Sequence, residues 1–317
     1  MKFIKFFTRL ILIAIVPLLL IDGIRRADLA FNPSSKNAYL AAIIDKMHLL
    51  DSVPSPRLIL MSGSSMAFGV DSDLLSKELE IPVVNASLHF KLGSRFMMDQ
   101  LKATVRKGDI VLITLEYVVT SKGKCEEKLM ASDFYPPAKD WIHFTSFSEE
   151  AGAYIIHRLT DFKLLIGEGW SGTRKKPINI NDTTSVFFRN CFAKNGDLLG
   201  HLNNPQPKFE VPEISVDVEF SNPIKDLNDF EAFAKQKGVT VFFIFPSYVE
   251  SGYEKNMTVL KIIEKQFRDN LKCSILGSPE NSVMDDVFFY DNVFHPNAQG
   301  RQIFTSRLIQ LLEQEGI

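Results

Sequence analysis

The stretch RLILMSGSSMAFG, residues 57–69, places a run of bulky apolar residues directly before a small polar turn. Leu58 to Met61 would form a short strand that is buried on both faces, and Gly63-Ser64-Ser65 would turn at its carboxyl end. Ligands of open parallel sheets bind outside the carboxyl ends of the strands. The stretch therefore predicts one strand of a buried sheet, with a serine at the place where a ligand would bind.

Strands and helices alternate after this point. The apolar runs predict strands at residues 57–63, 81–87, 109–117, 239–246 and 273–276, and the periodicity predicts helices at 72–80, 94–108, 224–238, 254–270 and 298–314. Asp71 or Ser72 can cap the first of these helices, and Gly108 and Gly238 would end two others. Such an alternation predicts an α/β fold with a parallel sheet that helices cover on both faces.

The first 24 residues are almost continuously apolar. Lys5 and Arg9 interrupt the run, and residues 10–21 carry no charge. A helix over residues 3–24 would be about 33 Å long at roughly 1.5 Å per residue, which is enough to cross a bilayer. Because no A-x-A-like cleavage site follows, we expect an uncleaved membrane anchor over residues 1–24. A cleaved signal peptide and a buried helix of a soluble protein are the alternatives.

Residues 120–222 interrupt the alternation and enter after the third strand, at the same end of the sheet as Ser65. One helix is expected near residues 151–165, and the rest is rich in Gly, Asn, Pro and Ser. We predict a cap insertion over the site, with a disordered surface insert as the alternative. The basic run Arg174-Lys175-Lys176 would be a solvated loop, or else a contact for an anionic substrate.

Composition narrows the class of protein. The chain has 317 residues, of which 45% are hydrophobic, enough for one sizeable core. A formal net charge of -2 gives no reason to expect nucleic acid as a partner. Cys125, Cys191 and Cys273 form no C-x-x-C pair, and no metal-binding or phosphate-binding motif occurs, so neither a metal nor a cofactor is expected. After the anchor we expect a helical linker at 25–56 and one domain at 57–317.

A serine nucleophile needs a base, usually a histidine, and a group that orients the base. Among the 6 histidines, His295 lies on a loop between the last strand and the last helix, at the same end of the sheet as Ser65. Asp291 precedes it on this loop, where a carboxylate can hold the imidazole in one tautomer. The plainer alternatives are that Ser65 is a turn residue or helix N-cap and that His295 caps the next helix.

These residues resemble the SGNH (GDSL-type) hydrolase superfamily. The resemblance rests on three segments: Gly63-Ser64-Ser65 with Gly69, Asn85 after the second strand, and Asp291 with His295. It covers about residues 57–119 and 224–314. It implies a three-layer, flavodoxin-like α/β/α sandwich around a five-stranded parallel sheet. It also implies that Ser65 attacks an ester carbonyl, with His295 as the base and Asp291 orienting that base.

The sequence departs from the family pattern around the histidine and after the second strand. The family's Asp-x-x-His becomes Asp-x-x-x-His here, so that Asn292 stands at the strict position and Asp291 one residue further away. Ser64 replaces the aspartate of the usual Gly-Asp-Ser block. The glycine whose backbone N–H would help to bind an oxyanion falls near His89 or Phe90, and a backbone donor does not require glycine.

The asparagine that the family carries after the third strand is absent, and Glu116 and Tyr117 stand there instead. An ionised glutamate only accepts hydrogen bonds and cannot stabilise an oxyanion. Tyr117 could donate in its place, or Asn85 could reach in. Losing one oxyanion donor costs roughly 100- to 1,000-fold in rate, which a specialised transferase could tolerate, as could a protein that has given up catalysis.

The first half of the domain is similar to membrane-anchored bacterial members that modify envelope polysaccharides. The resemblance therefore implies a serine-dependent acyl esterase or O-acyltransferase, acting on acyl groups such as acetyl of a cell-envelope polysaccharide through an acyl-Ser65 intermediate. The alternative is an inactive glycan-binding or scaffold subunit beside a multi-pass membrane acyltransferase. Basic residues before the apolar run favour a cytoplasmic N-terminus, which would make the chain a single-pass inner-membrane protein with its domain outside the cytoplasm. A soluble intracellular esterase would require the N-terminal segment to be a core helix.

Overall fold

Five parallel strands form the central sheet, in the order β2-β1-β3-β4-β6. The computed structural model describes residues 2–170 and 185–317, apart from the side chains of residues 2, 3, 7, 8, 10–14 and 164–170. The strands are β1 (Leu58–Met61), β2 (Val83–Asn85), β3 (Ile110–Ile113), β4 (Thr240–Ile244) and β6 (Ser274–Leu276). A second sheet pairs β5 (Tyr248–Val249) with β7 (Val283–Met284). The predicted α/β fold with a five-stranded parallel sheet is confirmed.

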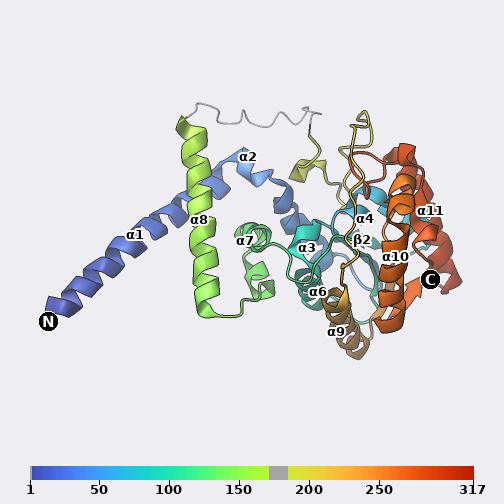
Figure 1. Ribbon diagram of the computed structural model, residues 1–317, viewed down its shortest axis with the longest axis horizontal. Helices are drawn as coiled ribbons and strands as arrows, with labels where there is room; N and C mark the ends of the chain where they lie inside the picture. The colour runs from blue at the N-terminus through green and yellow to red at the C-terminus, as the bar shows by residue number, and fades with distance from the viewer. Residues whose placement is uncertain (1, 171–184) are drawn as a thin grey trace.

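Helices surround the sheet (Figure 1). The α-helices are α1 (Lys2–Phe31), α2 (Pro33–Lys36), α3 (Ile43–Ser52), α4 (Ser65–Gly69), α5 (Ser72–Glu78), α6 (Ser94–Lys102), α7 (Cys125–Phe134), α8 (Phe147–Trp170), α9 (Ser221–Lys237), α10 (Glu250–Asn270) and α11 (Ala298–Gln314). Short 3₁₀ helices lie at η1 (Tyr39–Ala42), η2 (Phe90–Leu92), η3 (Pro136–Trp141), η4 (Arg189–Cys191), η5 (Glu280–Ser282) and η6 (Asp286–Phe288).

Local capping explains where several helices begin and end. Asp71 caps α5 as predicted, because its side chain accepts the Leu74 N–H at 3.1 Å. Gly238 ends α9 in the left-handed conformation, at φ 71°, which glycine adopts without strain. The prediction for α6 was wrong at its end: the helix stops at Lys102, and the Thr104 hydroxyl donates to carbonyls of the last turn.

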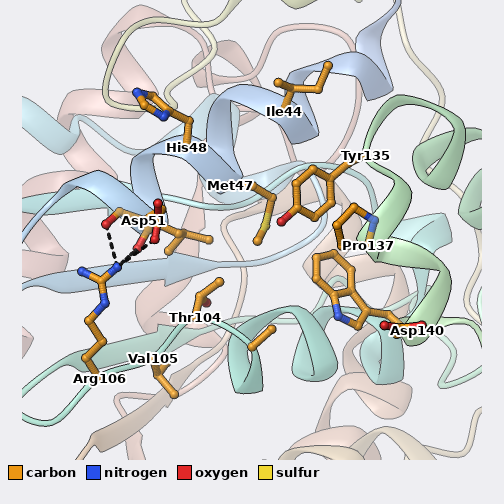
Figure 2. Close-up of a pocket in the computed structure, with 13 residues that line it drawn as sticks. Ile44, Met47, His48, Asp51, Thr104, Val105, Arg106, Tyr135, Pro137 and Asp140 are labelled. Carbon is orange, nitrogen blue, oxygen red and sulfur yellow. Dashed lines mark hydrogen bonds and ion pairs between the residues drawn. The ribbon is translucent and has the colours of Figure 1, made fainter.

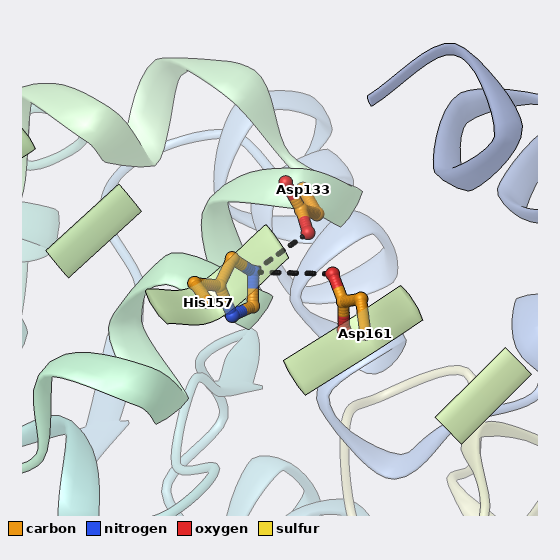
Figure 3. A group of neighbouring side chains, drawn as sticks. All are labelled: Asp133, His157 and Asp161. Carbon is orange, nitrogen blue, oxygen red and sulfur yellow. Dashed lines mark hydrogen bonds and ion pairs between the residues drawn. The ribbon is translucent and has the colours of Figure 1, made fainter. Parts of the chain in front are cut away.

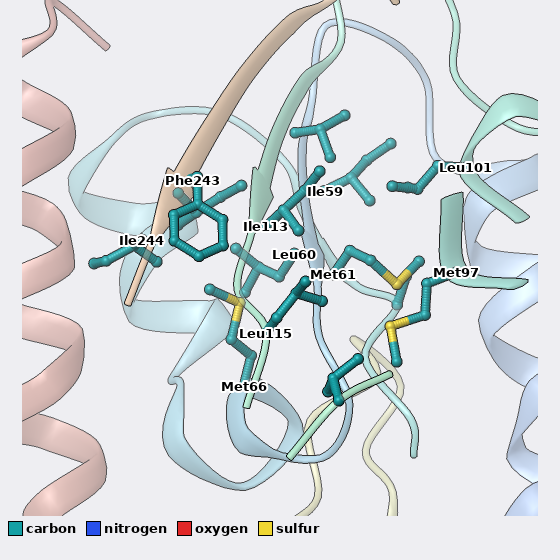
Figure 4. Close-up of a cluster of buried hydrophobic side chains, with 14 of the residues drawn as sticks. Ile59, Leu60, Met61, Met66, Met97, Leu101, Ile113, Leu115, Phe243 and Ile244 are labelled. Atoms are coloured by element: carbon teal, nitrogen blue, oxygen red, sulfur yellow. The ribbon is translucent and has the colours of Figure 1, made fainter. Parts of the chain in front are cut away.

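The core is built from the strands that read as continuous apolar runs. All four residues of β1 are buried, as expected for a central strand covered on both faces. Figure 4 shows Ile59, Leu60 and Met61 beside Ile113 of β3 and Phe243 of β4. This packing holds the carboxyl end of β1, and the turn that follows it, in one place.

The segment predicted to be a linker contributes to the same core. In α3, Ile43 and Leu50 are fully buried, and the Lys46 ammonium donates to the backbone carbonyl oxygens of Asn85 and Gly196. Residues 43–52 therefore pack as part of the sheet domain.

Helix α1 continues to Phe31, beyond the predicted anchor, and projects away from the sheet (Figure 1). Its second half lies against α8. Part of the predicted anchor, the side chains of residues 1–3, 7, 8 and 10–14, lies outside the described residues. Among the described residues, none of the helices combines the length and the apolar character needed to cross a membrane. The membrane anchor thus stays a prediction without support from the structure.

The described residues of the insertion at 120–222 form the helices α7 and α8 and the start of α9. Helix α8 covers the predicted helical segment, whereas α7 was not predicted, because the apolar residues of its sequence CEEKLMASDF follow no clear helical period. The basic run Arg174-Lys175-Lys176 lies outside the described residues. Cys125, Cys191 and Cys273 are free thiols.

Candidate active site

His295 lies between a serine and an aspartate. Its Nε2 is 2.7 Å from Ser64 Oγ, and its Nδ1 is 2.7 Å from Asp291 Oδ1. The loop that carries both residues is closed by a hydrogen bond from the Tyr290 N–H to the His295 carbonyl oxygen at 2.7 Å. This closure is what allows an aspartate four residues before the histidine to reach its ring. The arrangement is a serine–histidine–aspartate chain of the kind that activates a hydroxyl nucleophile.

The structure brings Ser64, and not the predicted Ser65, to the histidine. Ser65 is the first residue of α4; its side chain is turned into the domain and its Oγ is buried with no hydrogen-bond partner among the described residues. Ser64 precedes the helix, and its hydroxyl faces His295. The family's Gly-Asp-Ser pattern pointed to Ser65, and the two adjacent serines do not differ in residue type. The winding of the turn into α4 decides which of them faces the histidine.

Asn292 also contacts the imidazole. Its Nδ2 lies 2.7 Å from His295 Nδ1, while its Oδ1 accepts the Phe294 N–H at 2.8 Å. If Nδ1 is protonated, it donates to Asp291 and leaves Nε2 free to accept the Ser64 proton. If Nδ1 is unprotonated, it accepts from Asn292, and Nε2 donates to Ser64. Only the first tautomer makes His295 a base for the serine.

Aromatic residues fix the histidine ring and cover the site. The Phe68 ring of α4 stacks on the His295 imidazole, with centroids 3.7 Å apart and an interplanar angle of 6°. The ring centroid of Phe187, in the insertion, lies 5.9 Å from that of Phe68 and 6.5 Å from that of His295. The Leu198 N–H donates to the Ala67 carbonyl oxygen at 2.7 Å. Described residues of the insertion therefore lie directly over α4, next to the histidine.

Glu116 takes the place of the family's asparagine and points at the serine turn. Its Oε2 accepts the Gly63 N–H at 3.1 Å, and its Oε1 accepts the Ser65 N–H at 2.8 Å. The side chain is only 1% exposed. The backbone N–H of the residue after Ser64 is thus occupied by a carboxylate.

Asn85 does not reach the Ser64–His295 pair. Its amide donates to the Met66 carbonyl oxygen at 2.9 Å and to Asp197 Oδ1 at 2.8 Å, so both of its N–H groups are used. Asp197 belongs to the insertion and also binds Arg301 of α11. Asn85 therefore connects β2 to the insertion instead of serving the predicted oxyanion site.

The predicted backbone donors at His89 and Phe90 do lie beside the serine turn. A side chain at Gly63 would come within 2.7 Å of Phe90 Cα, which shows how closely the two backbones approach. Burial lowers the pKa of His89 to about 4, with smaller effects from the charges of Lys91 and His295. His89 is therefore neutral at pH 7 and leaves the site without an added positive charge.

Tyr117 and His201 are buried near the site without joining it. The Tyr117 ring packs against Tyr248 and Phe294, with centroids 5.2 and 6.0 Å apart, and in the described parts of the chain no hydrogen bond joins it to Ser64 or His295. His201, which the sequence did not single out, donates from Nε2 to the Pro296 carbonyl oxygen at 3.0 Å, and its ring centroid lies 4.7 Å from that of Phe68. It supports the loop that carries His295.

One cluster has the composition of a metal site. Asp133, His157 and Asp161 offer ligand atoms that all lie within 4.8 Å of one another (Figure 3). However, Arg158 forms two hydrogen bonds to the Asp133 carboxylate, at 2.6 and 2.7 Å, and Arg25 of α1 lies 3.4 Å from Asp161. Two guanidinium groups already balance the carboxylate charges, so the cluster fits an ion-pair network between α1, α7 and α8 better than a metal site.

A separate cavity of about 610 Å³ lies away from the candidate site. Figure 2 shows it between α3 and η3, with Met47, His48, Arg106 and Tyr135 among its lining residues. Neither Ser64 nor His295 lines it, so the cavity adds nothing to the serine–histidine–aspartate chain.

No protein-family model matches the chain, and no curated protein sequence matches it. Among solved structures, five chains match. One is the protein YxiM of Bacillus subtilis, at 11% identity and a TM-score of 0.36, over 84% of this chain and 58% of that one. The chain thus spans less than two thirds of the length of YxiM. A similarity at this TM-score carries no argument about fold or function.

Proposed function

We propose that the protein is a serine acyl esterase or O-acyltransferase of the SGNH type, with Ser64 as the nucleophile. The observation that carries the proposal is the chain of contacts Ser64–His295–Asp291, with 2.7 Å at each step. The α/β fold with helices around a five-stranded parallel sheet is consistent with the three-layer sandwich that the resemblance implies. The serine lies at the carboxyl end of β1, where ligands of such sheets bind.

In the proposed reaction, Ser64 Oγ attacks the ester carbonyl carbon while its proton passes to His295 Nε2. Asp291 stabilises the imidazolium that forms. When the tetrahedral intermediate collapses, the ester C–O bond breaks and the leaving alkoxide takes the proton from His295. The acyl group is then on Ser64, and a water or a sugar hydroxyl removes it in a second step with the same proton transfers. The choice between these acceptors separates an esterase from a transferase.

The substrate class follows from the resemblance: ester-linked acyl groups, such as acetyl, on a cell-envelope polysaccharide. The N-terminal segment would hold the domain at the outer side of the inner membrane, where such polymers are found. The apolar N-terminal segment is the sequence feature that supports this placement.

An organophosphonate probe tests the nucleophile, with two adjacent serines as matched variants. We expect the probe to label Ser64 in the wild type, Ser64→Ala and His295→Ala to lose the label, and Ser65→Ala to keep it. Because the Ser65 hydroxyl is buried and has no hydrogen-bond partner among the described residues, Ser65→Ala should also change stability by less than about 1 kcal/mol. Labelling on Ser65, or none in folded protein that still supports envelope acylation, would reject the assignment.

One observation favours a second candidate function, an inactive glycan-binding or scaffold subunit beside a membrane acyltransferase. Glu116 occupies the Gly63 and Ser65 N–H groups, and the Ser65 N–H is where a serine hydrolase would be expected to receive an oxyanion. An unreactive wild type that binds the polysaccharide equally well with Ser64→Ala would support this second function.

A further inference from the structure

Glu116 is a buried carboxylate that forms no ion pair within the part of the chain that the structure describes. Burying an ionised carboxylate is costly unless hydrogen bonds compensate the charge. In residues 2–170 and 185–317, no Lys, Arg or His forms an ion pair with Glu116, and the Gly63 and Ser65 N–H groups are its hydrogen-bond donors. Among the described residues, these two backbone groups are the ones that compensate the charge, and the turn and the carboxylate hold each other in place.

The turn is built to receive this carboxylate. A Cβ at Gly63 would lie 2.5 and 2.6 Å from the two Glu116 oxygens and 2.7 Å from Phe90 Cα. Neither a backbone atom nor a buried carboxylate can withdraw far enough to admit it. Gly63 is thus required by the close approach of Glu116, and the glycine and the glutamate form one structural unit.

The two N–H groups flank Ser64 on either side. A carboxylate that binds both fixes the main chain before and after the serine, and the Ser64 hydroxyl makes its hydrogen bond to His295. We propose that Glu116 is a positioning residue that holds the Ser64 hydroxyl against His295, an inference that rests on the proposed acyl transfer. Because Glu116 accepts from the Ser65 N–H, this role implies that other donors receive the oxyanion.

Two carboxylates frame the serine and the histidine. Burial raises the pKa of the Tyr39 phenol above its usual range, and the charges of Glu116 and Asp291 raise it further. A second negative charge beside a forming oxyanion would slow the reaction if Glu116 served only to fill the turn. The change in kcat when the Glu116 charge is removed therefore distinguishes a glutamate that positions Ser64 from one that blocks the serine turn.

The test is Glu116→Gln, with Glu127→Gln as the control, because Glu127 is a partly exposed glutamate paired with Lys91 at 3.6 Å. A glutamine keeps the shape but can accept from only one of the two N–H groups. For p-nitrophenyl acetate we expect kcat to fall about 10- to 100-fold with KM within twofold, as for other misplaced catalytic groups. Glu116→Asp, which keeps the charge but is one methylene shorter, should also lose activity.

The ¹⁵N chemical shifts of the His295 ring nitrogens test the contact between Ser64 and His295 without any substrate. Their ¹⁵N shifts in Glu116→Gln should move toward those of Ser64→Ala, while Glu127→Gln keeps the wild-type shifts. Wild-type shifts and wild-type kcat in Glu116→Gln would overturn the inference, and so would a rise in kcat, which would show that Glu116 blocks the turn. A wild type that fails to react with ester, while its His295 shifts still depend on Glu116, would support the positioning contact and reject the proposed function alone.

Discussion

At the scale of single residues, Asp291 and Asn292 compete for the same nitrogen of His295, each at 2.7 Å. An asparagine can hydrogen-bond an imidazole but cannot stabilise an imidazolium by charge. We expect Asp291→Asn to lower kcat by several orders of magnitude, roughly 10⁴-fold by analogy with other triads, and Asn292→Ala to lower it much less. Kinetics of ester hydrolysis by the two variants would decide, and the reverse ranking would assign the orienting role to Asn292.

The sequence could predict that His295 and Asp291 lie together, because few residues of their type lie on a loop at the correct end of the sheet. It could not predict that Ser64, and not Ser65, lies against His295, because the two serines do not differ in residue type and only the winding of the turn into α4 separates them. It also could not show that the amide of Asn85 is used by Met66 and Asp197. Side-chain direction in a turn depends on tertiary packing, which the pattern of residue types along the chain does not record.

At the scale of elements, α1 is held to the insertion by buried ion pairs. Arg158 of α8 bonds to Asp133 of α7, and also lies 3.0 Å from Asp22 of α1, while Arg25 of α1 faces Asp133 and Asp161. These contacts join three helices far apart in sequence. The hydrophobic pattern could predict α8, but not its partner, because the joining residues are polar and carry no periodicity.

Acid should weaken this ion-pair network. Burial alone would raise the pKa of Asp133, but the hydrogen bonds from His157 and Arg158 outweigh it and lower the pKa from 3.8 to about 2. A carboxyl group whose pKa is lowered in the folded state stabilises the fold above its unfolded pKa, and this stabilisation is lost as pH falls from about 4 through about 2. Asp133→Asn should therefore cost on the order of 2 to 4 kcal/mol near pH 7, and progressively less below pH 4.

Urea unfolding of wild type and Asp133→Asn between pH 7 and pH 2.5 measures this difference. Asp269→Asn is the matched control, because its ion pair with Lys265 is exposed and should contribute less than about 0.5 kcal/mol at any pH. A cost of Asp133→Asn that stays constant down to pH 2.5 would show that ionisation of Asp133 does not stabilise the folded state.

At the scale of the whole molecule, the parts that the sequence predicted best are the ones that pack on the central sheet. β1, β3 and β4 are continuous apolar runs with glycine or polar residues at their ends, and α11 was predicted with its observed bounds. The part predicted least well is the N-terminal region. There the apolar helix α1 projects away from the sheet, whereas α3, which lies in the predicted linker, packs against the core. Hydrophobicity shows that such segments must be covered, but it does not show whether protein or lipid covers them.

The exposed face of α1 provides a test of this question. Ile15, Val16, Leu19 and Leu20 are 45, 46, 65 and 62% exposed, whereas Ile21, on the other side of the helix, is buried at 6%. Contiguous apolar surface of this kind is unfavourable in water and marks a contact with lipid or protein.

We expect the full chain to sediment with inner membranes, to resist carbonate extraction and to expose its sheet domain to protease added outside the cytoplasm. A variant lacking residues 2–20 should become soluble and stay folded, since Asp22 and Arg25 keep their partners on α7 and α8. Recovery of the full chain in the cytosol, with Met1 intact, would reject both the anchor and the envelope substrate, and would leave α1 as a helix that a protein partner covers.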